Sequence, residues 1–150
     1  MKRIILVVVS ILYCTYCMAE YVDLGLPSGT KWSKENEIGF YNWVEALAKF
    51  DNKLPNNTQF DELKDLCSWI WTGKGFKVVG PNGNFIYLPA TGWRNCTNNE
   101  SLYSVGSCGN YWSSTSSHSI KADNLFIFSE GVAIISSERC QGLSVRLVMY

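Results

Sequence analysis

The chain has 150 residues, of which 13 are basic and 13 acidic, and its hydrophobic content of 47% is sufficient for one domain with a buried core. The balanced charge and the absence of a basic run argue against a nucleic-acid partner. No segment approaches the roughly 20 consecutive apolar residues of a membrane-spanning helix, which argues against stable membrane insertion.

The N-terminal segment is typical of a secretory signal peptide. Lys2 and Arg3 precede an apolar stretch over 4–12, and Ala19 supplies the small residue that cleavage requires. We therefore expect residues 1–19 to be removed and the protein to be exported to the periplasm, the cell surface or the medium.

The remaining segment, 20–150, is expected to form a single domain, because no low-complexity linker divides it. Cys14 and Cys17 lie close to the cleavage region, so attachment of a lipid is an alternative to simple cleavage. Each of these cysteines follows a bulky tyrosine, which favours cleavage after Ala19.

The first half of this domain is expected to contain a strand and two helices. Alternation over 21–24 before a Pro-Ser-Gly turn indicates a short strand. Apolar residues then recur at helical spacing over 43–50, where Asn42 can cap the helix. The segment 58–61 has the form of a capping box and predicts the start of a second helix.

The second half changes to strand periodicity. Segments 76–79 and 85–88 flank Asn82-Gly83, a pair that favours a hairpin turn. Residues 90–110 are rich in Gly, Asn and Ser and predict a long ordered loop. Further strands are expected over 125–128, 132–135 and 143–148. Two early helices, a long loop and a late antiparallel sheet predict an α+β fold.

Four cysteines remain after the predicted cleavage: Cys67, Cys96, Cys108 and Cys140. An even set in an exported chain indicates disulfides, and four cysteines allow three pairings. We favour Cys96 with Cys108, which would close the long loop, and Cys67 with Cys140, which would join a helix to the last strands. No pair has the Cys-x-x-Cys spacing of zinc ligands, so no metal site is expected.

Five ordered motifs resemble one bacterial family. They lie at 21–32, 54–63, 88–94, 109–114 and 142–147. The family is the Fibrobacter succinogenes major paralogous domain, which is abundant in secreted proteins of Bacteroidota. The resemblance implies a C-type-lectin-like fold, related to the formylglycine-generating-enzyme type and to retroelement variable receptors, whose C-terminal sheet and loops present the ligand surface. Unlike the family pattern, this chain lacks most of the insertion after the first motif.

Catalysis and cofactor binding are not expected. The chain contains none of the Glu-Pro-Asn, Gln-Pro-Asp or Trp-Asn-Asp strings with which lectins of this fold bind calcium. His118, the only histidine, lies among serines, but no nucleophile-elbow motif surrounds them. Cys140 is the only cysteine near the chain end, whereas the catalytic relatives resemble one another in a reactive pair.

Three large side chains in the motifs are interpreted as structural. Trp93 and Trp112 are expected to pack in the core, because large aromatic residues usually bury most of their surface. Arg146 is expected to meet a carboxylate or backbone carbonyls in the last strand.

The sequence favours a binding module that recognises a protein or glycan without metal, in an adhesin-like or host-facing role. The alternatives are a structural subunit of a surface assembly without a ligand and, third, an enzyme. The predicted ligand-binding residues lie in a polar loop over 116–119 and at the polar tip that follows the strand 132–135: Ser116, Ser117, His118, Ser119, Ser136, Ser137, Glu138 and Arg139.

Overall fold

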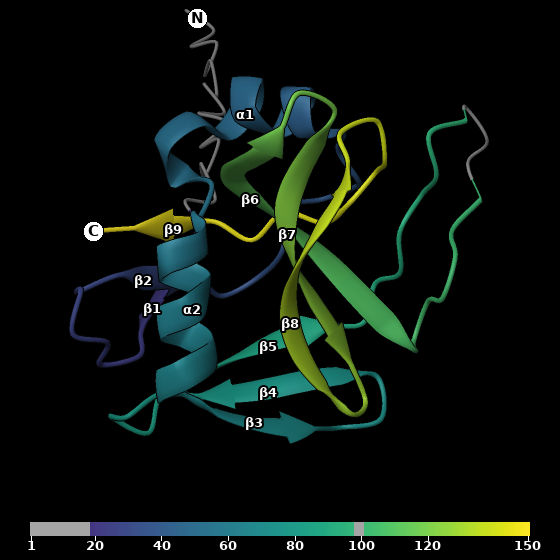
Figure 1. Ribbon diagram of the computed structural model, residues 1–150. Coiled ribbons are helices and arrows are strands. Elements are labelled where there is room, and N and C mark those ends of the chain that lie inside the picture. Colours follow the sequence, from purple (N-terminus) through teal and green to yellow (C-terminus); the bar gives the residue numbers. More distant parts are fainter. Residues whose placement is uncertain (1–18, 98–100) are drawn as a thin grey trace, which may run out of the picture.

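The computed structural model describes residues 19–97 and 101–150 (Figure 1). The predicted signal peptide, with Cys14 and Cys17, lies outside the described residues except for Ala19. The elements are β1 (Tyr21–Asp23), β2 (Lys31–Ser33), α1 (Trp43–Phe50), a 3-10 turn (Asp51–Lys53), α2 (Asn57–Leu66), β3 (Ser68–Trp71), β4 (Gly75–Val79), β5 (Phe85–Pro89), β6 (Cys108–His118), β7 (Lys121–Phe128), β8 (Gly131–Glu138) and β9 (Val148–Met149). No helix in these described ranges is long and apolar enough to cross a membrane.

The strands form three antiparallel sheets of three strands each, with the orders β1-β2-β9, β3-β4-β5 and β6-β7-β8. Two helices precede most of the strands, so the predicted α+β class is confirmed. The first sheet brings the two ends of the described domain together, because β2 pairs with both β1 and β9. Helix α2 lies beside the third sheet and contacts its strands, and the second sheet lies below both in the view of Figure 1.

Both helices begin at asparagine capping boxes. In α1 the side chain of Asn42 accepts a hydrogen bond from the Glu45 amide, and the Glu45 carboxylate accepts one from the Asn42 amide, which confirms this predicted helix and its cap. Helix α2 begins earlier than predicted, since Asn56 and Gln59 form its capping box. Asparagine is at least as good a cap as threonine, so Asn56 takes the position expected for Thr58.

The predicted hairpin over 76–88 is confirmed as β4 and β5, but the late strands differ from expectation. The loop ends earlier than predicted, because β6 starts at Cys108 and pairs with β7. Segments 125–128 and 132–135 form only parts of the longer strands β7 and β8. The predicted strand at 143–148 is instead mostly a chain of isolated bridges, including Leu143 to Tyr41 and Ser144 to Tyr111, before the short β9.

Two hydrophobic clusters form the core. One joins α2 to the first two sheets and β7 through side chains such as Trp32, Phe60 and Leu125. The other surrounds Trp112, which is 0% exposed and donates its indole N–H to the Tyr41 carbonyl at 2.7 Å. The prediction that Trp112 packs in the core is confirmed. Trp93 is half-buried against the second cluster.

Arg146 is the largest charged side chain in the interior, with 1% of its surface exposed. Its guanidinium donates to the carbonyls of Ser33, Lys34 and Tyr87, and to Asn36 Oδ1 at 2.8 Å. This bonding confirms the prediction that Arg146 meets backbone carbonyls. Arg146 thereby connects β2, β5 and the C-terminal segment from within.

The favoured disulfide pairing is wrong. Cys96 is bonded to Cys140, with their Cα atoms 4.9 Å apart, while Cys67 and Cys108 are free thiols. The cause is a long-range antiparallel contact in which Arg94 and Gly142 exchange two backbone hydrogen bonds, of 2.8 and 3.0 Å. Because the contact is antiparallel, this register places residue 96, two residues after Arg94, opposite residue 140, two residues before Gly142.

Candidate functional site

The two predicted polar tips meet at one end of the third sheet, and we call residues 116–119 and 136–139 together the polar rim. Strand β7 is antiparallel to both β6 and β8, so these two strands finish at the same edge. Lys121 accordingly pairs with His118 on one side and Glu138 on the other. The rim lies near the start of α1 (Figure 1), where the Trp43 amide donates to the Arg139 carbonyl at 2.9 Å.

Arg139 holds the two halves of the rim together. Its Nη2 donates to Ser116 Oγ at 2.6 Å and to the His118 carbonyl at 2.7 Å, and its Nε donates to the Lys121 carbonyl at 3.2 Å. The guanidinium also stacks over the Trp43 ring at 4.2 Å, a cation–π contact. Arg139 therefore serves to position the rim, and its Nε and Nη2 donors are already occupied within the fold.

Ser136 and Ser137 are engaged on opposite faces of β8. Ser136 Oγ donates to Asp123 Oδ1 at 2.7 Å, while Ser137 Oγ accepts from Asn124 Nδ2 at 2.8 Å. Partial burial acts to raise the pKa of the Asp123 carboxyl, but hydrogen bonds, including that from Ser136, lower it overall. These two serines therefore connect β8 to β7.

The remaining side chains of the rim, Ser117, His118, Ser119 and Glu138, are all exposed, and a hydrogen bond from Ser117 also helps to lower the pKa of the Asp123 carboxyl. His118 Nδ1 makes only a long contact, 3.5 Å, with the Ile120 amide. Glu138 Oε2 lies 3.3 Å from Cys96 Sγ, beside the disulfide. Hydroxyl, imidazole and carboxylate groups on a fixed frame can exchange hydrogen bonds with a polar partner.

Cys96, Glu138 and Cys140 are also the one group of three metal-ligating side chains within the described ranges. A thiolate is the form of cysteine that binds a metal, and here both sulfur atoms are joined in the disulfide. The oxidised chain therefore offers only the Glu138 carboxylate at this position.

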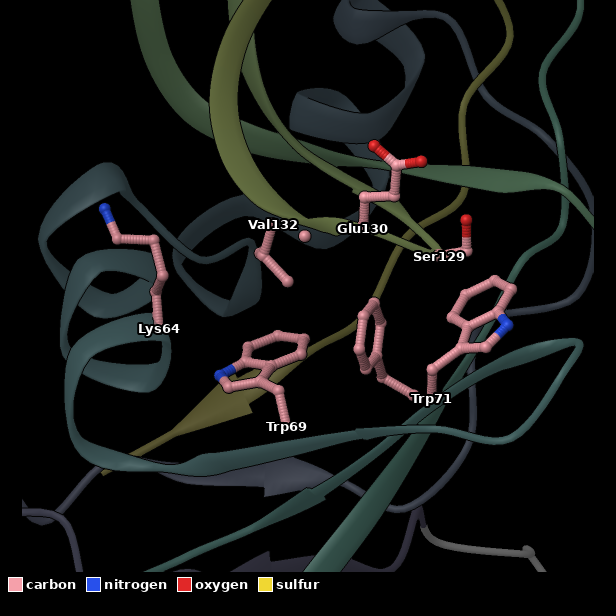
Figure 2. A pocket seen from close by; sticks show the side chains of 8 residues that line it. Lys64, Trp69, Trp71, Ser129, Glu130 and Val132 are labelled. Atoms are coloured by element: carbon pink, nitrogen blue, oxygen red, sulfur yellow. The ribbon is translucent and has the colours of Figure 1, made fainter.

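A second surface lies at the opposite end of the third sheet, and sequence reasoning missed it. We call it the aromatic cleft, an open hollow of about 440 Å³ between α2, the second sheet and the β7–β8 turn (Figure 2). Its lining residues are Lys64, Trp69, Trp71, Phe76, Ser129, Glu130, Gly131 and Val132. Tryptophan at alternate positions of a short apolar segment was the available signal, since residues i and i+2 of a strand share a face.

The described chain is thus a small α+β domain with one disulfide and two surface features at opposite ends of one sheet. The family described as a domain of unknown function (DUF8237) matches residues 68–148, which is more than half of the chain, and the protein belongs to this family. The matched segment starts at β3 and includes the polar rim and both cleft tryptophans. Searches of curated proteins and of solved structures found no match.

Proposed function

We propose that the protein is a binding module that recognises a protein or glycan partner without a metal ion, through the polar rim. The observation that supports this most strongly is the convergence of two polar segments, distant in sequence, into one exposed edge held by Arg139. A surface whose backbone is already fixed loses little conformational entropy on binding. The partner would be contacted by Ser117, His118, Ser119 and Glu138.

We also propose that the domain has a C-type-lectin-like fold and is related to the Fibrobacter succinogenes major paralogous domain. Support comes from the first and last strands, which lie in one sheet on either side of β2, with both helices and a long loop between them in the chain. Export to the periplasm, the cell surface or the medium belongs to the same proposal. The Cys96–Cys140 bond favours it, because disulfides persist in oxidising compartments.

The test uses a combined array of glycans and purified surface proteins. The purified protein is compared with a variant that carries Ser117→Ala, Ser119→Ala and Glu138→Gln. We expect the variant to lose at least tenfold in affinity for any partner of the wild-type protein, while its stability changes by no more than about 0.5 kcal/mol, as is usual for exposed sites. Binding should persist in EDTA.

A matched control replaces exposed charges away from the rim, Lys53→Ala and Lys74→Ala, and should bind as the wild type does. Equal affinity of the rim variant, or loss of binding in EDTA, would contradict the proposal. A protein that recognises only further copies of itself would instead support the structural-subunit alternative.

A further inference from the structure

The floor of the aromatic cleft consists of three rings in a fixed arrangement. Trp69 and Trp71 lie on the same face of β3 (Figure 2). Phe76 on the neighbouring strand β4 is paired with Trp71. Phe76 packs edge-on against both indoles, with ring centroids 5.4 and 5.1 Å apart. Such edge-to-face pairs are favourable and hold the rings in place. The floor is therefore rigid and apolar.

The polar end of Trp69 is already used within the fold. Its indole N–H donates to the Leu63 carbonyl in α2 at 3.3 Å, which fixes the orientation of the ring. Trp69 and Trp71 are only half-buried, whereas Phe76 is 4% exposed. Trp69 therefore offers the cleft mainly its ring surface, and the exposed part of the Trp71 indole lies beside it.

The edges of the cleft are polar. Exposed Ser129 and Glu130 come from the β7–β8 turn above the rings, and Lys64 stands at the α2 side (Figure 2). The Glu130 carboxylate extends from this turn into solvent, so its side chain must rotate to contact a ligand that lies on the rings. The Lys64 ammonium is held by Asp61 at 2.8 Å, whereas Glu130 forms no ion pair within the described ranges. The cleft thus combines an aromatic floor with a hydroxyl and an unpaired carboxylate on the facing edge.

We propose that the aromatic cleft binds a neutral saccharide chain. A pyranose ring has an apolar C–H face, which can lie on an indole, and an edge of hydroxyl groups, which can donate to the Glu130 carboxylate and exchange hydrogen bonds with Ser129. The cleft volume of about 440 Å³ lies within the usual range of small-molecule sites. This site is separate from the polar rim and does not depend on the function proposed for it.

Other ligand classes fit the cleft less well. A purely apolar ligand would remove water from Glu130 without replacing its hydrogen bonds, which is unfavourable. An acidic sugar would place its charge next to the same carboxylate. A quaternary ammonium ion needs rings that surround it, but these rings pack against one another at 5.1–5.4 Å and leave no space between them.

The test follows the tryptophan indole N–H signals of the ¹⁵N-labelled protein by NMR, during titration with neutral hexasaccharides of β-1,4-linked glucose, xylose, mannose or N-acetylglucosamine. We expect at least one of these to shift the Trp69 and Trp71 signals in a saturable manner. The buried Trp112 signal should stay in place and serves as an internal reference.

Variants assign the binding to the cleft. Trp71→Ala should lower the affinity at least tenfold, and Glu130→Ala, which lies in an exposed turn and should not disturb folding, should lower it about threefold or more. The matched control is Ile70→Ala, on the opposite face of the same strand, which should bind like the wild type, as should the rim variant.

Three results would overturn the proposal. They are the absence of any shift with all four hexasaccharides, equal affinities of the Trp71→Ala and Ile70→Ala variants, and shifts caused by choline but by none of the sugars.

Discussion

Replacement of Arg146 by methionine tests whether its buried guanidinium holds the domain together. Methionine has a similar length and is apolar, so it fills most of the space while removing every donor. The change also relieves the unfavourable burial of a charge, which by itself would be stabilising. The acceptors, however, are the carbonyls of Ser33, Lys34 and Tyr87 and the side chain of Asn36, and they remain in place.

The loss of hydrogen bonds should dominate. A buried acceptor left without a partner costs about 1–3 kcal/mol. The variant leaves several such acceptors, and removal of the buried charge offsets part of their summed cost. We therefore expect Arg146→Met to lower the free energy of unfolding by about 4 kcal/mol, a large part of the roughly 5–15 kcal/mol of a typical domain. The midpoint of thermal unfolding should fall by about 10–15 °C.

Urea unfolding, followed by tryptophan fluorescence and by circular dichroism, measures this change. Arg146→Lys serves as the comparison, because an ammonium retains the charge and can donate to some of the carbonyls but lacks the planar fork. It should lose about half as much stability as Arg146→Met. A loss below about 1 kcal/mol in the methionine variant would refute the reasoning.

The cysteines and one buried tyrosine give three further predictions. The double variant Cys96→Ser/Cys140→Ser should lose roughly 2–4 kcal/mol in urea unfolding, because the bond closes a loop with a sequence separation of 44; an unchanged midpoint would contradict this. Burial raises the pKa of the Cys67 thiol to about 11 and also raises that of Cys108, so neither forms much of the reactive thiolate at pH 8. A thiol reagent at this pH should therefore modify neither cysteine until urea unfolds the chain, and rapid labelling of the native protein would contradict this. Burial also raises the pKa of Tyr111 to about 12, so at high pH the folded state retains protons that the unfolded chain releases. The free energy of unfolding should therefore fall as the pH rises from about 9 to 12, and it should fall less steeply in Cys67→Ala or Tyr111→Phe. A free energy of unfolding that stays constant over this range would contradict the link between these buried groups and stability.

Elements set by local chemistry were predictable from the sequence. Asn42 and Glu45 cap α1 through contacts three residues apart, and the hairpin between β4 and β5 follows from strand alternation on either side of Asn82-Gly83. The deep burial of Trp112 and the carbonyl contacts of Arg146 were also predictable, because large aromatic and charged side chains have few favourable environments inside a protein.

Features that depend on long-range register were not predictable. The serine-rich end of β6 has the composition of a loop and becomes strand only because β7 pairs with it. The disulfide follows from the contact between Arg94 and Gly142, which no local pattern encodes. The polar character of residues 116–119 and 136–139 could be predicted from the sequence. The contacts by which Arg139 joins these segments could not, because they depend on how the strands of the sheet are paired.

The aromatic cleft shows the same limit. Trp69 and Trp71 alternate visibly in the sequence, yet the polar edge that faces them comes from Ser129 and Glu130, far along the chain. A sequence can therefore indicate which side chains share a strand face more readily than it can indicate which turn will stand opposite.

The antiparallel arrangement of β7 with its two neighbours has a consequence for how many molecules the domain can hold. One end of this strand carries the polar rim and the other the aromatic cleft, and an eight-residue strand is roughly 25 Å long. Occupants of the two sites would not collide. A single copy could therefore act as a bridge, joining a saccharide at one pole to a different molecule at the other.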